Sequence, residues 1–224
     1  MVGIRRFEFD GALGIDASQA DAFDSAAPLI DAALAGRNAC ILAYGQTGAG
    51  KTYTMLGEPG FPGIVPRAME RLWAAAEADD SAEWRLSLTY AELYNDAFRD
   101  LLAPPLAGGA RPLPCELEEA RRRRSSIKLE LNQAATPRGR AAAVGAPPAH
   151  YLTGSATFHT RIDSLDHTLE LLAKGHKARA MGSTLCNERS SRSHAVITVD
   201  IRAIPVGGDR PRHSKLHLVD LAGS

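Results

Sequence analysis

One stretch decides the fold of this chain: Gly45-Gln46-Thr47-Gly48-Ala49-Gly50-Lys51-Thr52. It satisfies the phosphate-binding pattern G-x-x-x-x-G-K-[S/T] at every fixed position. The glycines let backbone N–H groups turn inward around phosphate oxygens, Lys51 supplies a point charge, and the Thr52 hydroxyl is placed to ligate magnesium. The run 38–44 in front of it is short and largely apolar, which predicts a strand buried on both faces. The stretch therefore predicts a nucleoside triphosphate site between a strand and a helix.

This loop alone does not define a reaction. Phosphate loops serve kinases, switches, motors and pumps alike, so the reaction has to be read from partner residues elsewhere in the chain. A chance glycine-rich turn between a strand and a helix is the alternative, and the apolar run in front of the loop argues against it.

The composition indicates a single α/β domain. The chain has 224 residues, of which 45% are hydrophobic, enough for one core of ordinary size. Lys and Arg together number 26, and so do Asp and Glu, so no global charge directs the chain to nucleic acid or to an anionic membrane. Its 3 cysteines lie outside any C-x-x-C pattern, which argues against a disulfide framework or a zinc site and favours a reducing compartment. The sequence begins without the apolar core of a signal peptide, and no apolar run is long enough to span a bilayer.

The phosphate loop indicates the P-loop NTPase form of the α/β class, for which we expect a central, mostly parallel or mixed β-sheet flanked by helices. A capping box at Ser18 and Asp21 predicts a helix that ends at Gly36, and Pro28 either kinks this helix or restarts it. Two further helices are expected over about 65–76 and 164–182. The expected strands are 7–10, 84–95, 127–131, 195–203 and 215–221.

Other segments are expected to be irregular. The Pro- and Gly-rich run 56–63 predicts a surface loop, and composition predicts disordered insertions at 103–126 and 134–149. The last expected helix carries Gly175, which costs up to about 1 kcal/mol of helix propensity. Its apolar stripe is expected to be Leu165, Leu169, Leu172 and Ala173.

A phosphate loop needs an acidic residue on the magnesium side and a group that senses the terminal phosphate. Asp220 ends an apolar strand and Gly223 follows three residues later, so the two form a D-x-x-G element. Asp and Gly are also common after strands simply because they favour turns. The functional interpretation of the element is stronger because the same chain carries a phosphate loop. A dense polar block at 187–194 is a further candidate, and an ordinary turn before a strand is the alternative.

Together, segments 45–52, 187–194 and 220–224 closely resemble the motor domain of the kinesin family, in the order in which that family carries them. Segments 9–10, 16–19, 90–96 and 100–102 are also similar to kinesin sequence, so the resemblance covers nearly the whole chain apart from the insertions. Within the kinesin family, residues 8–55 most resemble the sequences of the minus-end-directed, C-terminal-motor group. The resemblance implies an ATPase that couples hydrolysis to movement, with ATP and Mg²⁺ as cofactors, the microtubule as partner, and a place on the cytoskeleton in the cytoplasm.

The resemblance also implies roles for individual residues. Asn187, Ser190 and Ser191 would sense the terminal phosphate and place the attacking water, and His194 would orient or pack this switch rather than act as a base. Magnesium would be held by Thr52, Ser191 and, through water, Asp220. The nucleotide would be bound by Gly45, Gln46, Thr47, Gly48, Ala49, Gly50, Lys51, Thr52 and Tyr53. The catalytic group would be Asn187, Ser190, Ser191, Arg192, Asp220 and Gly223.

The sequence departs from the kinesin pattern at its ends. In kinesins a glutamate follows the second-switch serine and pairs with the arginine that corresponds to Arg192, whereas this sequence ends at Ser224. The relay helix, the neck and the first strand with its Arg-x-Arg-Pro are also not in it. We therefore expect an incomplete motor domain that binds nucleotide weakly and shows no microtubule-stimulated turnover. The alternatives are a non-catalytic nucleotide-binding or interaction module, and an unrelated phosphate-loop switch or kinase.

Overall fold

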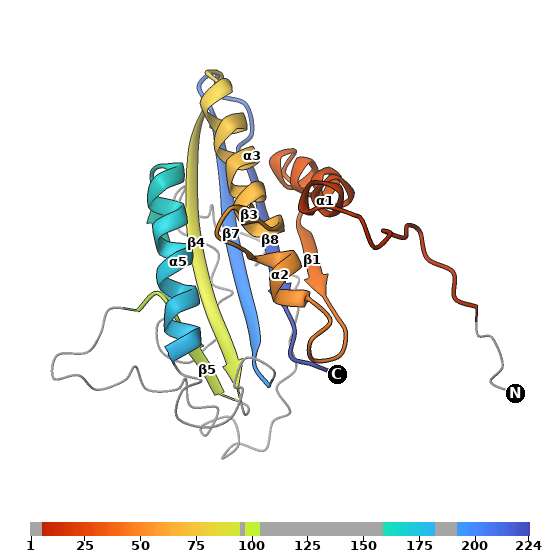
Figure 1. Cartoon of the computed structure of the whole chain (residues 1–224). Helices are drawn as coiled ribbons and strands as arrows, with labels where there is room; N and C mark the ends of the chain where they lie inside the picture. The colour runs from red at the N-terminus through yellow and green to blue at the C-terminus, as the bar shows by residue number, and fades with distance from the viewer. Residues whose placement is uncertain (1–5, 95–96, 104–158, 182–191) are drawn as a thin grey trace, which may run out of the picture.

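The structure of the chain, a computed structural model, describes residues 6–94, 97–103, 159–181 and 192–224. A 6-stranded mixed sheet forms its centre (Figure 1). Along the sheet lie, in order, β1 (Ala39–Ala43), β8 (Arg212–Asp220), β7 (His194–Pro205), β4 (Ala82–Tyr94) and β5 (Ala97–Asp100), and β6 (Thr160–Ile162) also pairs with β4. β1 and β8 run parallel, and the other pairs in this sheet are antiparallel. The mixed sheet with its flanking helices confirms the expected fold class.

Helices pack over this sheet. In Figure 1, α5 (Leu165–Met181), α3 (Ile64–Ala78) and α1 (Gln19–Leu34) lie side by side in front of it, and the short α2 (Lys51–Met55) follows the loop after β1. One row of buried side chains runs across four adjacent strands in register: Ala39, Leu216, Val199 and Leu88. α3 buries Ile64, Val65, Ala68, Met69 and Leu72 in the same core cluster. The burial of this apolar layer holds the helices to the sheet.

The first helix, α1, begins and ends where the sequence predicts. The Asp21 backbone N–H donates to Ser18 Oγ at 3.2 Å, and the Ser18 backbone N–H donates to Asp21 Oδ2 at 2.7 Å, which completes the capping box. At the other end Gly36 has a φ of 89°, the left-handed conformation with which many helices stop. Pro28 lies inside this single helix, so the helix does not restart there.

Two expectations for the N-terminal part of the chain are wrong. Residues 7–10 form no strand, and Phe7 and Phe9 are exposed. A strand needs a neighbour for its backbone hydrogen bonds, and Figure 1 shows the chain before α1 running away from the sheet. Segment 56–63 is not irregular, because β2 (Gly57–Glu58) and β3 (Phe61–Pro62) pair as a short antiparallel hairpin.

The strand before the glycine-rich loop, β1, is less buried than predicted. Within the described part of the chain it lies at one end of the strand order, with β8 beside it. Side chains alternate along a strand, so Cys40 and Leu42 point to the face opposite Ala39, and Leu42 is 57% exposed. The prediction of burial on both faces is therefore wrong, because only the helix side of β1 is packed.

The position of α5 agrees with the prediction, but its buried face does not. The His167 backbone N–H donates to Ser164 Oγ at 3.1 Å, so Ser164 caps the helix. The expected stripe member Ala173 is exposed. The buried stripe is Thr168, Leu172, Gly175 and Arg179. A threonine, a glycine and an arginine do not form an apolar pattern, which is why periodicity alone misplaces this face.

Several expected features lie outside the described residues. They are the strand 127–131, the helix end at Gly182, and both insertions, 103–126 and 134–149, apart from Ala103. Among the helices that are described, none has both the length and the apolar character needed to cross a membrane.

Candidate nucleotide-binding site

The glycine-rich loop leaves β1 and enters α2 at Lys51, so the predicted strand, loop and helix follow one another as expected. Gly48 and Gly50 have φ values of 81° and 85°, a left-handed conformation that residues with a Cβ rarely adopt. The loop curves around the lysine, whose Nζ donates to the carbonyl oxygens of Gly45 and Gln46, both at 2.8 Å. An ammonium group is therefore held within the curve of the loop.

The end of β8 brings an aspartate to this loop. Ala43 lies opposite Asp220 in the parallel register of β1 and β8, so the carboxyl ends of the two strands meet at one edge of the sheet. Thr52 Oγ1 donates to Asp220 Oδ2 at 2.7 Å, across 168 positions in the sequence. The Ser224 backbone N–H also donates to the Gly45 carbonyl at 3.2 Å. The structure thus brings together the glycine-rich loop and the D-x-x-G element.

One carboxylate oxygen of Asp220 has no partner in the described part of the chain. Its side chain is only 5% exposed, and Oδ1 is buried with no hydrogen-bond partner among the described residues. A buried carboxylate oxygen without a partner is costly. Carboxylate, hydroxyl and water oxygens are the ligands that Mg²⁺ prefers, and an ammonium group suits a phosphate chain. Asp220, Thr52 and Lys51 therefore fit a magnesium ion accompanied by a polyphosphate.

The rest of the D-x-x-G element packs directly on the loop. A Cβ added at Gly223 would collide with the Thr47 hydroxyl and would fall 2.9 Å from the Thr47 backbone nitrogen. Only glycine permits this approach without a shift of the loop. His194 also contacts the element, because the Ala222 backbone N–H donates to its Nδ1 at 3.1 Å. The role expected for His194, to orient or pack the switch at 187–194, stays a prediction, because most of that segment lies outside the described residues.

The structure describes only some of the other predicted site residues. Asn187, Ser190 and Ser191 lie outside the described residues, so their roles stay predictions. Arg192 is described and exposed. Tyr53 in α2 is 45% exposed, and its carbonyl accepts a hydrogen bond from the Gln19 side chain.

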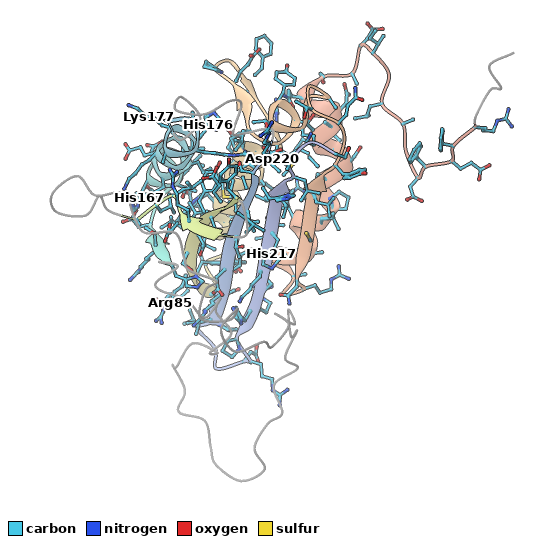
Figure 2. The ribbon with its side chains drawn as sticks, turned by 90° about the horizontal axis from the view of Figure 1, so that it is seen from below. Arg85, His167, His176, Lys177, His217 and Asp220 are labelled. Carbon is cyan, nitrogen blue, oxygen red and sulfur yellow. The ribbon has the colours of Figure 1, made fainter. Side chains whose placement is uncertain are left out.

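A residue outside every motif reaches the same aspartate. Arg179 Nη1 lies 2.6 Å from Asp220 Oδ2, and the two side chains are 3% and 5% exposed. Figure 2 shows Asp220 near the centre of the molecule, whereas His176 and Lys177 lie on the outer side of α5. The one signal in the sequence is spacing, because Arg179 follows Gly175 by one helical turn on the stripe that the structure buries.

More buried polar side chains of β4 lie beneath α5. Burial raises the pKa of Tyr90 from 10.0 to about 12, so its phenol keeps its proton even in alkaline solution where a free tyrosine ionises. Glu92 Oε2 lies 3.5 Å from Arg99 Nη1, and the Arg99 guanidinium also donates to the Ala178 carbonyl in α5. Charged and polar groups therefore hold this end of α5 to the sheet, close to Asp220.

A strand, a glycine-rich loop with its lysine, a helix and an aspartate at the end of the parallel neighbouring strand define a P-loop NTPase. The chain belongs to the kinesin motor domain family, whose model matches residues 3–224. It is 37% identical over 220 residues to "Kinesin-like protein KIFC2" from Homo sapiens, a match that covers 98% of this chain and 22% of that protein. It is 35% identical over 227 residues to "Kinesin-like protein KIN-14C" from Oryza sativa subsp. japonica, covering 99% of this chain and 20% of that protein.

The chain thus spans about a fifth of the length of these curated relatives. Among solved structures it is similar to the one described as "Structure of a fast kinesin: Implications for ATPase mechanism and interactions with microtubules". That likeness has a TM-score of 0.72 and 30% sequence identity, and covers 97% of this chain and 54% of the other. The family expected from the sequence is confirmed, and the lean towards the C-terminal-motor group fits the kinesin-like proteins KIFC2 and KIN-14C among the relatives.

Proposed function

We propose that this chain binds ATP with Mg²⁺ and is part of a kinesin motor that couples ATP hydrolysis to movement along microtubules of the cytoplasmic cytoskeleton. The observation that carries the proposal is the 2.7 Å hydrogen bond from Thr52 Oγ1 to Asp220 Oδ2, which brings the glycine-rich loop and the D-x-x-G element to one point. Membership of the kinesin motor domain family supports the ATP and microtubule parts.

The loop would bind phosphate through its backbone and its lysine. Backbone N–H groups of segment 46–51 would hold phosphate oxygens. The Lys51 ammonium group, which contacts the carbonyls of Gly45 and Gln46 at 2.8 Å, would exchange these contacts for the outer phosphates. Thr52 would ligate magnesium directly, and Asp220 would do so through a water molecule at Oδ1.

Hydrolysis of a phosphoanhydride depends mainly on positioning and charge stabilisation. Bound Mg²⁺ would neutralise charge that develops on the phosphates. Gly223 would offer its N–H to the terminal phosphate, and Asn187, Ser190 and Ser191 would place the attacking water, as the family resemblance implies. These groups would move when phosphate leaves. Such a movement couples hydrolysis to a conformational change in the rest of a motor.

Nucleotide binding is tested with a fluorescent ATP analogue and the purified protein, with Mg²⁺ and with a chelator. We expect binding that depends on Mg²⁺ and that Lys51→Ala weakens by about tenfold or more, because a charge-assisted contact to phosphate is lost. The control is Lys177→Ala, which removes an exposed lysine from α5 and is expected to bind like the wild type. Binding that is as tight in Lys51→Ala as in the wild type would refute the site.

The motor part is tested on a protein that is extended past Ser224 through the relay helix and the elements that follow it in kinesins, by co-sedimentation with stabilised microtubules in the presence of ADP or a non-hydrolysable ATP analogue. We expect the amount of protein that pellets to differ between the two nucleotides, because the affinity of a motor for the microtubule depends on which nucleotide is bound. Equal pelleting in both nucleotides would contradict a motor function.

A further inference from the structure

The side chain of Gln19 joins the first turn of α1 to the helix that follows the glycine-rich loop. Its Nε2 donates to the Tyr53 carbonyl in α2 at 2.8 Å, across 34 positions in the sequence. Gln19 is only 8% exposed, whereas glutamine side chains are mostly exposed in folded proteins. The fold therefore buries this polar side chain against one particular acceptor.

The acceptor is a carbonyl group for which its own helix supplies no donor. α2 has only 5 residues, and the last four carbonyl groups of a helix have no partner within it. In a longer helix the Tyr53 carbonyl would accept from residue 57, but Gly57 has a φ of 79° and begins β2. Gln19 thus satisfies the end of α2 from a neighbouring helix.

The donor comes from a part of the chain that is itself fixed. Ser18 and Asp21, on either side of Gln19 in the sequence, form the capping box that holds the first turn of α1. Further along the same helix, Ile30 and Ala33 are fully buried in the core. The first turn of α1 can therefore serve as a support for α2.

α2 carries two side chains of the nucleotide site. Lys51 begins the helix, and the hydroxyl of the next residue, Thr52, donates to Asp220 at 2.7 Å. A helix of 5 residues is too short to be stable on its own. The position of Lys51 and Thr52 therefore depends on contacts at both ends of α2, with the site at one end and Gln19 near the other.

Binding is tighter when the groups that touch a ligand are already ordered, because less conformational entropy is lost on binding. We propose that Gln19 is a positioning residue: its hydrogen bond to Tyr53 orders α2 before the nucleotide arrives, and thereby strengthens the binding of ATP with Mg²⁺. This role rests on the proposed function, because α2 affects binding only if the glycine-rich loop holds phosphate.

The test is the affinity of the purified protein for a fluorescent ATP analogue in Mg²⁺. Gln19→Met nearly keeps the length of the side chain and removes the N–H donor. We expect it to weaken binding about fivefold, the factor that corresponds to the loss of one hydrogen bond. An affinity of Gln19→Met within about twofold of the wild-type value would overturn the proposal.

A second variant separates the donor from the shape of the side chain. Gln19→Glu has almost the same shape, but it places a carboxylate, which only accepts hydrogen bonds, beside the Tyr53 carbonyl. We expect it to weaken binding at least as much as Gln19→Met, and it replaces that variant if Gln19→Met does not fold. Binding as tight in Gln19→Glu as in the wild type would overturn the role of the donor.

Hydrogen exchange measures the order of α2 directly. The backbone N–H groups of Thr54 and Leu56 donate to carbonyls four residues earlier, both at 2.8 Å, so their exchange reports how often the helix opens. Without nucleotide, we expect these groups to exchange several-fold faster in Gln19→Met than in the wild type. Equal exchange in the two proteins would overturn the proposed ordering of α2.

A control in the same helix separates positioning from a general loss of stability. Ile30→Val removes one carbon from a fully buried side chain of α1 that lies in the core, so it should lower thermal stability and leave the affinity unchanged. A loss of affinity in Ile30→Val as large as in Gln19→Met would overturn the positioning role. A wild-type protein that binds no ATP analogue would instead refute the proposed function, whereas wild-type binding with unchanged affinity in both Gln19 variants refutes the role of Gln19 alone.

Discussion

The ring of Tyr90 lies against the backbone of Gly175, in the space where any larger residue would place its Cβ. An added Cβ would fall 2.8 Å from Tyr90 Cε1 and 3.1 Å from Cγ, which is closer than carbon atoms normally approach. The glycine costs α5 up to about 1 kcal/mol of helix propensity. In return the helix lies close enough to β4 for Arg179, one turn later, to reach Asp220 at 2.6 Å.

The first prediction concerns this contact. Gly175→Ala is expected to lower the free energy of unfolding by about 1–3 kcal/mol, the usual cost of overpacking a filled core. Urea denaturation measures the change. Lys177→Ala, at an exposed position of the same helix, is the control and should change the value by less than about 0.5 kcal/mol. If Gly175→Ala is more stable than the wild type, helix propensity rather than packing decides this position.

Tyr90 also predicts a loss of stability in alkali. Burial raises its pKa from 10.0 to about 12, so the folded protein holds the phenol proton more tightly than the unfolded chain does. The stability that results is complete below pH 10 and is lost as the pH rises towards 12. At about pH 11 the loss is about 1.4 kcal/mol.

Tyr90→Phe removes this titration. Urea denaturation at about pH 9 and about pH 11 should therefore show a smaller decrease in the free energy of unfolding for Tyr90→Phe than for the wild type, by about 1.4 kcal/mol. The other tyrosines and the lysines titrate in both proteins, so they cancel in the comparison. An identical decrease in the two proteins would show that Tyr90 ionises freely in the folded state.

The structural features near the site that the sequence predicts and the structure confirms are local ones. The glycine-rich loop carries its geometry in its own residues, because Gly48 and Gly50 adopt the left-handed conformation with φ values of 81° and 85°. Asp220 is recognisable because it ends an apolar strand, and parallel strands bring such ends to one edge. The capping box at Ser18 and Asp21 likewise depends on residues only three apart.

The features that the sequence does not predict depend on contacts between distant segments. Arg179 belongs to a buried stripe of α5 that is not apolar, and only the packing of α5 on β4 shows that its charge is buried beside Asp220. Alternation at 7–10 predicts a strand, but a strand forms only where a neighbour accepts its hydrogen bonds. The apolar run of β1 resembles a strand buried on both faces, yet Leu42 is 57% exposed because β1 lies at one end of the described strand order.

The buried pair of Arg179 and Asp220 should be strongly coupled. Arg179→Met or Asp220→Asn alone leaves a buried charged group without its partner, and each is expected to cost about 3–5 kcal/mol. The double variant removes both charges and should cost clearly less than the sum of the two. A double-mutant cycle by urea denaturation measures the coupling energy.

The pair of Arg71 and Asp31 is the matched reference for this cycle. Its nitrogen and oxygen atoms approach to 2.7 Å, but the side chains are 44% and 50% exposed. Water competes with such a contact, so the corresponding cycle should give less than about 1 kcal/mol. A coupling energy for Arg179 and Asp220 no larger than that of the surface pair would contradict a buried interaction.

The last prediction separates the hydrogen bond that the Thr52 hydroxyl makes to Asp220 from the bond that it is expected to make to magnesium. Thr52→Ala removes the hydroxyl that donates to Asp220 at 2.7 Å and that would ligate magnesium. The affinity for a fluorescent ATP analogue in Mg²⁺ should fall by about tenfold or more, the usual effect of losing a group that holds or orients a metal, and should change little in a chelator. Thr52→Ser keeps the hydroxyl and should bind like the wild type, as should Thr54→Ala, which makes the same change elsewhere in α2. An equal loss with and without Mg²⁺ would show that the hydroxyl acts on the protein rather than on the metal.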